Sequence, residues 1–479
     1  MWAHVVREAR QQFRFEGFSF VLVAVLYLVV LIALFLADYA FCRWHKWSDL
    51  LAIYWRQLLV LQMVVLHVLV VVKLSVSVVG DRRGKRLAFE LMASRGAWHS
   101  VFGRLFGGSL FAFFLVLLSL PFALFCVLGG GVGGRGVGIA YAVLFGGWFA
   151  YGAHAILVST LARRSITAIV GALALVFVVS ALVYTARELR LDTLAALSPL
   201  HQVQPLFGVS VGRVFFAGRL IQPFVLTLVF LLFAGYWFLT AAARLLRPGG
   251  GPAISRPHGL ALLASGGALF ALAVRPSRAG DDGPLRMLLL LSVMFVLMLV
   301  STFILVRRRT RSAGGFGRWL GGGLLRTDAP YLPFFLGQVL IYALVWLLLG
   351  RPILGGEISA GMRAGVVMAL VMVPLLVLFY GLLVKALVSV FDERGRLVAA
   401  FLFLLQAVVP LAFEMGRPVG AYSLLQILNP LVLIGAPLGV IETKVGVANF
   451  SLCALLCYGS ASLLLAGLLK MRRPLIAAA

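Results

Sequence analysis

The sequence predicts an all-α polytopic membrane protein with about 12 transmembrane helices. Of its 479 residues, 62% are hydrophobic and only 12% are charged. The mean hydropathy is +1.05, whereas a soluble domain carries roughly 25% charged residues. Apolar runs of about spanning length for a ~30 Å hydrocarbon core recur along the whole chain. They cover residues 18–37, 53–79, 101–128, 137–160, 166–184, 220–243, 258–274, 287–306, 334–350, 364–391, 397–413 and 447–469.

The first 17 residues predict an interfacial helix rather than a cleavable signal peptide. One helical stripe is apolar and another carries Arg7, Arg10 and Arg14, the pattern of a helix lying on a membrane surface. The segment is charged, and the apolar run that follows has full spanning length. We therefore expect a surface helix that leads into the first span.

The distribution of basic residues predicts that both termini are cytosolic. If all twelve runs span, roughly 25 Lys and Arg face the cytosol and roughly 13 face outside, as the positive-inside rule requires. The run at 258–274 is short and contains glycine, but omitting it would place Arg307, Arg308 and Arg309 outside. The net charge of +26 would suggest nucleic acid in a soluble chain. In a membrane protein it is explained by positive-inside loops and anionic lipid, so no nucleic-acid partner is expected.

An internal repeat predicts two fused units of six helices. Leu157-Val158-Ser159 aligns with Leu387-Val388-Ser389 at a shift of 230 residues, and Ser198-Pro199-Leu200 aligns with Asn429-Pro430-Leu431 at a shift of 231. A single offset that holds over several elements indicates duplication, and an even number of spans gives two units of the same orientation.

The predicted boundaries follow from the repeat and from a Pro- and Gly-rich stretch. Residues 1–243 form the first unit, 244–257 a cytosolic linker centred on Pro248-Gly249-Gly250-Gly251-Pro252, and 258–479 the second unit. The two longer outer segments, 185–219 and 414–446, carry little charge. We expect partly embedded or interfacial pieces there.

The segment from Gly80 to Trp98 carries the strongest functional signal. Asp81, Arg82, Arg83, Lys85 and Arg86 cannot enter hydrocarbon cheaply, because a charge at the bilayer centre costs roughly 3 kcal/mol. Glu90 then lies among Leu87, Leu91 and Trp98, whose helical spacing predicts a short helix along the membrane face. The segment is not a phosphate-binding loop, because its glycines are too close and no Ser or Thr follows Lys85.

Several stretches in the first 200 residues resemble the ABC-2 type transporter permeases. They are the Leu-rich LAFELMASRG piece with its Glu, the Gly103-Arg104 entry into a span with Pro121, the Leu128-Gly129-Gly130 exit, and the turn from Val158 to Ser165. The resemblance implies the membrane subunit of an ATP-driven exporter in the bacterial cytoplasmic membrane. ATP and Mg²⁺ would then be bound by a separate cytosolic ATPase, with no cofactor in this chain.

The resemblance also implies how the chain works. The ATPase would push on the interfacial helix and on the segment from Gly80 to Trp98, with Asp81, Arg82, Arg83, Gly84, Lys85 and Glu90 as coupling residues. The two fused units imply a pseudo-dimer within one chain. The transported substrate would be lipid-like, a glycan, a drug or a peptide.

Other interpretations remain open. The Asp81-Arg82-x-Gly84-Lys85-Arg86 pattern and the six-plus-six arrangement are also similar to major-facilitator carriers, while a plain positive-inside loop would need no partner. A membrane-embedded enzyme is a third hypothesis, but no Ser-His-Asp set, HExxH motif or paired acids within a span support it.

Two histidines fall within predicted spans. His67 and His154 are candidates for the transport pathway because ionisable groups are costly in a membrane. A neutral histidine that bonds to a neighbouring helix explains them equally well. Cys453 and Cys457 lie one helical turn apart, but no His or acid joins them, so no metal site is expected.

Overall fold

The chain is a helical, polytopic membrane protein. The computed structural model describes residues 17–41, 46–84, 96–162, 164–174, 214–216, 219–247, 253–274, 283–305, 331–350, 360–391 and 454–465, with positions 6, 176 and 434. Apart from a two-stranded hairpin of β1 (Val214–Phe216) and β2 (Arg219–Ile221), the elements in this part of the chain are helices. The predicted interfacial helix, the run at 397–413 and nearly all of 414–446 lie outside the described residues.

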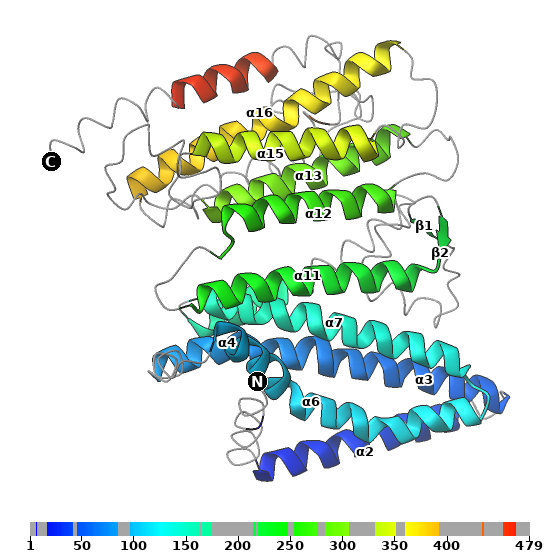
Figure 1. The fold of residues 1–479 in the computed structure, drawn as a ribbon. Helices are drawn as coiled ribbons and strands as arrows, with labels where there is room; N and C mark the ends of the chain where they lie inside the picture. The colour runs from blue at the N-terminus through cyan, green and yellow to red at the C-terminus, as the bar shows by residue number, and fades with distance from the viewer. Residues whose placement is uncertain are drawn as a thin grey trace, which may run out of the picture. The chain divides into compact units, whose positions relative to one another are not determined.

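Helices in the first part of the chain follow the apolar runs. They are α2 (Gly17–Phe41), α3 (Trp47–Met63), α4 (Val70–Arg83), α6 (Ala97–Leu128), α7 (Gly134–Leu161) and α11 (Pro223–Leu245) (Figure 1). A backbone in lipid must satisfy its own hydrogen bonds, and a helix does so within each run. The structure also contains the helix Ser165–Ala174.

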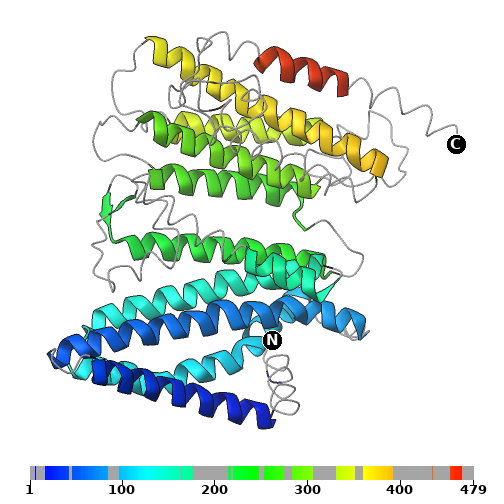
Figure 2. The same cartoon turned by 180° about the vertical axis from the view of Figure 1, so that it is seen from behind.

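The helix that contains the second predicted run, 53–79, is longer than that run. A π-helical turn, η1 (Val64–Leu69), joins α3 to α4, so Trp47–Arg83 is one helix of 37 residues (Figure 2). At 1.5 Å per residue it is about 55 Å long, well beyond a ~30 Å hydrocarbon core. Its charged end therefore extends out of the membrane. Trp98, expected in a separate short helix, lies instead in the first turn of α6.

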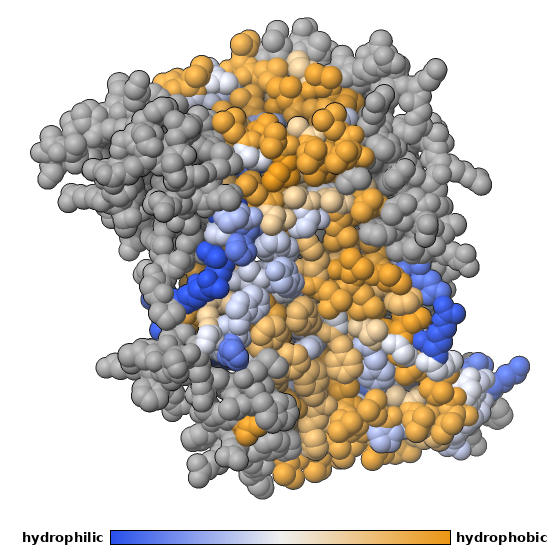
Figure 3. Space-filling model, in the orientation of Figure 1, coloured by the Kyte–Doolittle hydropathy of each residue, from blue (hydrophilic) through white to orange (hydrophobic). Residues whose placement is uncertain are grey.

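Six helices within the described residues are long and apolar enough to cross a membrane. They are Val21–Ala40, Trp47–Arg83, Ala97–Leu128, Gly134–Leu161, Pro223–Leu245 and Gly365–Val384. On the face shown in Figure 3, apolar side chains cover most of the described helical surface, and the most hydrophilic ones lie near helix ends. Large exposed apolar surfaces of this kind suit contact with lipid.

The chain divides into two compact units. The first comprises residues 1–214 and 220–253, and the second comprises 215–219 and 254–479. Helix α7 is central in the first unit, where it packs against α4, α6, α11 and η1. In the most apolar stretch of α7, 67% of the residues are buried inside the protein, against 22% in that of α2. Helix α2 is therefore a peripheral, lipid-facing helix.

Glycine ends α6 in a tight turn. Gly130 has φ of 79°, a left-handed conformation that favours glycine at a helix C-terminus. The Gly131 N–H donates to the Cys126 carbonyl at 2.9 Å. Beyond this turn the backbone of Gly131 packs closely against Leu51 of α3.

The second unit contains α12 (Arg256–Val274), α13 (Gly283–Leu305), α15 (Tyr331–Val345) with the π-helical turn η3 (Trp346–Gly350), and α16 (Ala360–Phe391). The helix Ala454–Leu465 follows near the C-terminus. Helix α12 packs against α13 and α15, and α13 packs against α16. The Gln338 amide of α15 donates to Ser301 Oγ of α13 at 2.8 Å.

The two units pack their helices in a similar order. A shift of about 230 residues places α2, the α3–α4 helix, α6 and α7 over positions that overlap α12, α13, α15 and α16. In the first unit α2 contacts α3 and α6, and α4 contacts α7. The contacts of α12 with α13 and α15, and of α13 with α16, are the corresponding ones.

Candidate functional site

Four of the predicted coupling residues end the long Trp47–Arg83 helix. Asp81, Arg82 and Arg83 form the last turn of α4, and Gly84 is its C-cap. Because this helix is longer than a bilayer core, these residues lie beyond the hydrocarbon. Lys85 and Glu90, the other two predicted coupling residues, lie outside the described residues.

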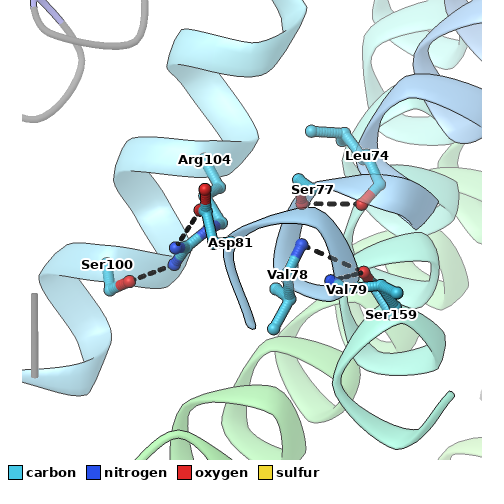
Figure 4. A network of polar contacts seen from close by, with 8 residues as sticks. All are labelled: Leu74, Ser77, Val78, Val79, Asp81, Ser100, Arg104 and Ser159. Carbon is cyan, nitrogen blue, oxygen red and sulfur yellow. Dashed lines mark hydrogen bonds and ion pairs between the residues drawn. The ribbon is translucent and has the colours of Figure 1, made fainter. Parts of the chain in front are cut away.

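Asp81 joins α4 to α6. Its Oδ2 accepts a hydrogen bond from Arg104 Nη2 at 2.7 Å, and the two side chains form an ion pair (Figure 4). Arg104 is 3% exposed and Asp81 is 24% exposed. The other guanidinium nitrogen, Nη1, donates to Ser100 Oγ one turn earlier in α6. Asp81 thus neutralises a cation that would otherwise be buried without a counter-ion.

Arg82 joins α4 to the end of α7. Its guanidinium donates to the carbonyl of Thr160 at 2.8 Å and to that of Ala162 at 3.2 Å. The last carbonyls of a helix have no partner within it, and a cation there also interacts favourably with the helix dipole. Arg82 therefore caps α7 from the neighbouring helix.

A hydroxyl from α7 reaches the backbone of α4 next to these two residues. Ser159 Oγ accepts hydrogen bonds from the backbone N–H of Val78 at 3.1 Å and of Val79 at 3.3 Å (Figure 4). The Ser159 side chain is fully buried. This contact holds α4 and α7 at close approach one turn before Asp81.

Together these contacts define an α4-end network, which we take to be Asp81, Arg82, Ser100, Arg104 and Ser159. It connects the last turn of α4 to α6 through an ion pair and to α7 through a cap and a buried hydroxyl. Arg83 and Gly84, which follow directly, are exposed. A force applied to the chain after Gly84 would therefore reach three helices at once, with Arg83 available to a partner.

His67 lies in the π-helical turn η1 and bonds to a neighbouring helix. Its Nε2 is 3.0 Å from the carbonyl oxygen of Leu144 in α7, and its ring contacts Tyr151 edge to face at 5.2 Å. A Cβ on Gly147 would collide with the His67 ring. The imidazole fills a space that the missing side chain of Gly147 provides.

His154 has different neighbours. Its Nε2 is 3.4 Å from the Gly171 carbonyl oxygen, and its ring contacts Phe238 of α11 at 5.0 Å. The structure therefore does not join the two histidines in one site. Each contacts the backbone of an adjacent helix, which is a structural role that the sequence left open.

No group of three or more His, Cys, Asp or Glu side chains within the described residues has the geometry of a metal site. Comparisons with known proteins give no family. No protein-family model, curated protein or solved structure matches the chain.

The sequence reasoning did not assign Arg104, Ser100 and Ser159 to the site. Arg104 and Ser159 occur in the stretches that resemble ABC-2 permeases, but as features of composition only. Opposite charges at neighbouring span ends could have predicted this ion pair. Asp81 follows one predicted span and Arg104 begins the next, at the same face of the membrane. Residues on consecutive antiparallel helices at one face are natural partners, and here they bond.

Proposed function

We propose that this chain is the permease subunit of an ATP-driven exporter of the ABC-2 type in the bacterial cytoplasmic membrane. The observation that carries the proposal is the α4-end network, because it connects the charged end of α4 directly to α6 and α7. The short helix expected after Gly84 would receive the ATPase. ATP and Mg²⁺ would bind to that separate subunit.

The similar packing order in the two units supports a pseudo-dimer. Two fused units of six spans, with both termini in the cytosol, would enclose one path within a single chain. Nucleotide-driven closure of two ATPase subunits or domains would push on the ends of the spans and alternate the exposure of that path. The substrate that we propose for this path is lipid-like, a glycan, a drug or a peptide.

Arg83 allows a direct test of ATPase coupling. Its exposed side chain lies at the end of α4, so Arg83→Glu reverses one charge without disturbing the ion pair of Asp81. We expect the ATPase to bind the purified complex at least about tenfold more weakly, since a reversed charge at an interface costs about 1.4 kcal/mol or more. Its thermal stability should be unchanged.

Arg135→Glu is the matched control. Arg135 is also exposed, but it lies in the first turn of α7, whereas Arg82 contacts the last turn of that helix. It should leave the bound ATPase and ATP hydrolysis at wild-type levels. Transport by a wild-type particle that contains no ATPase would overturn the proposal.

A major-facilitator carrier is the second candidate, favoured by the Asp81-Arg82-x-Gly84-Lys85-Arg86 pattern. Such a carrier uses an ion gradient and needs no ATPase. Transport that persists without ATP and collapses with the proton or sodium gradient would favour it.

A further inference from the structure

A buried acid lies far from the α4-end network. Asp38 is three residues from the end of α2, next to the turn into α3, whereas Asp81 lies at the other end of the α3–α4 helix. Asp38 is only 7% exposed. Its Oδ1 accepts a hydrogen bond from the side-chain amide of Gln57 in α3 at 2.8 Å.

This pair contains two unmatched acceptors. Asp38 Oδ2 and Gln57 Oε1 are both buried, and neither has a hydrogen-bond partner among the residues that the structure describes. Leaving one buried polar atom unsatisfied costs about 1–3 kcal/mol, and more for a charged group. An ionised Asp38 would carry the cost of an unsatisfied acceptor and, in addition, the cost of a buried charge. A single hydrogen between Asp38 Oδ2 and Gln57 Oε1 would satisfy both oxygens, because the two side chains are already held together by a hydrogen bond.

Among the described residues, no hydrogen bond supplies such a donor to either oxygen. The Phe35 ring, one turn before Asp38, contacts Trp47 at 6.4 Å, Tyr54 at 5.3 Å and Phe125 of α6 at 5.8 Å. The Tyr54 hydroxyl donates to the Leu31 carbonyl at 3.0 Å.

The charged and titratable groups on the adjoining helices do not pair with Asp38 either. Lys46 and Asp49 at the start of α3 are exposed, Arg56 is half-buried, and Cys126 of α6 is a buried free thiol. Within the described part of the chain, no ion pair joins Asp38 to any of them.

We propose that Asp38 and Gln57 form a proton-binding site in the first unit. Asp38 takes one proton from the water at the membrane face where α2 turns into α3. An O–H bond forms at Oδ2 as one O–H bond of a hydronium ion breaks and leaves water, so the negative charge of Asp38 is neutralised. The new O–H donates to Gln57 Oε1 while Gln57 Nε2 donates to Asp38 Oδ1, which closes a cyclic acid–amide pair. One proton thereby satisfies both unmatched oxygens.

Proton release has a structural consequence. A carboxylate at this position needs water, because no described donor bonds to Asp38 Oδ2. Separation of the adjacent ends of α2 and α3 would admit that water. Proton occupancy is therefore linked to the packing of these two helices, whatever drives transport.

Infrared difference spectroscopy of the full-length purified protein at neutral pH tests the protonation directly. Subtracting the Asp38→Asn spectrum from that of the wild type should reveal one protonated-carboxyl C=O band. Asp49→Asn is the matched control, since Asp49 is an exposed acid at the start of the next helix. It should remove carboxylate bands and leave the protonated band intact. Loss of only carboxylate intensity in Asp38→Asn would mean an ionised Asp38 held by a cation, and would overturn the proposal.

Gln57 provides an independent test of the pairing. Gln57→Leu removes both amide contacts, so the Asp38 C=O band should shift to the higher frequency of a carbonyl without a hydrogen bond. An unchanged band would show that Gln57 is not its partner. Asp38→Asn, which also presents one acceptor and a donor to Gln57, should keep the wild-type melting temperature, while Asp38→Ala should lower it. Equal destabilisation by Asn and Ala would contradict a neutral acid.

Discussion

Arg104 is the residue around which the polar contacts at the end of α4 are arranged. A guanidinium with 3% exposure requires a counter-ion, and Asp81 supplies it at 2.7 Å. Of the predicted coupling residues, Asp81 and Arg82 thus have partners within the chain. Arg83 has its side chain exposed and is the better candidate for contact with another protein.

A double-mutant cycle on Asp81 and Arg104 tests this arrangement. Asp81→Asn should cost about 1–3 kcal/mol of stability, because it leaves the Arg104 charge buried without its counter-ion. The double variant with Arg104→Gln should be less destabilised than the sum of the single changes, with a coupling of about 0.5–3 kcal/mol. Thermal unfolding in detergent measures these differences.

The exposed acid Asp49 provides the control for that cycle. Asp49→Asn should change stability by less than about 0.5 kcal/mol, as is usual at surface sites. Strict additivity of the Asp81 and Arg104 changes would show that the ion pair contributes nothing to the fold.

At the scale of the element, α7 is the helix that organises the first unit. Small residues on α7 allow close packing: Gly147 admits the His67 ring from η1, and Gly146 faces Leu228 of α11. These two glycines therefore accommodate η1 and α11.

Gly147→Ala tests the packing of α7 against η1. A Cβ at this position would collide with the His67 ring, so we expect a loss of about 1–3 kcal/mol, typical of overpacking. Removing the ring in His67→Ala should make the alanine at 147 tolerable. The melting temperature of each variant, and of the double variant, measures this rescue.

Gly138→Ala is the matched control on the same helix, since a Cβ there meets no atom within 4 Å. Alanine should be neutral or stabilise α7 by up to about 1 kcal/mol, because glycine is the poorer helix former. A Gly147→Ala variant as stable as Gly138→Ala would refute the proposed close contact.

At the scale of the whole molecule, the proposed function requires one chain to supply both halves of a transport path. The overlapping helix positions and the similar packing order of the two units are what this duplication would produce. A permease with one six-span unit would need two copies.

Native mass spectrometry of the active, detergent-extracted complex tests the pseudo-dimer. We expect one copy of this chain with two ATPase subunits or domains, because the two units already form a pair. Coupling should be stronger through the first unit, since the charged turn and the Glu90-containing helix that the sequence predicts after it have only a partial counterpart near Arg307. Two copies of this chain in each active particle would refute the pseudo-dimer.

The sequence by itself determined that this is a helical membrane protein, and where most of the described helices lie. Continuous apolar runs have few alternatives in a bilayer, because the backbone must satisfy its own hydrogen bonds. Charge likewise indicated that Asp81 and Arg82 lie outside the hydrocarbon. Both conclusions follow from the properties of the lipid bilayer. The order of apolar and charged residues along the chain is therefore enough to reach them.

Only the tertiary structure decided which polar groups meet. The partners of Asp81, Arg82 and His67 are 23, 78 and 77 residues away along the chain. Hydropathy does not specify the rotation of one helix against another. That rotation follows from side-chain packing, as at Gly147 and His67, and it also placed Asp38 opposite Gln57. The physical reason is that lipid selects helices by their composition, whereas contacts between helices depend on the shape and hydrogen bonding of individual residues.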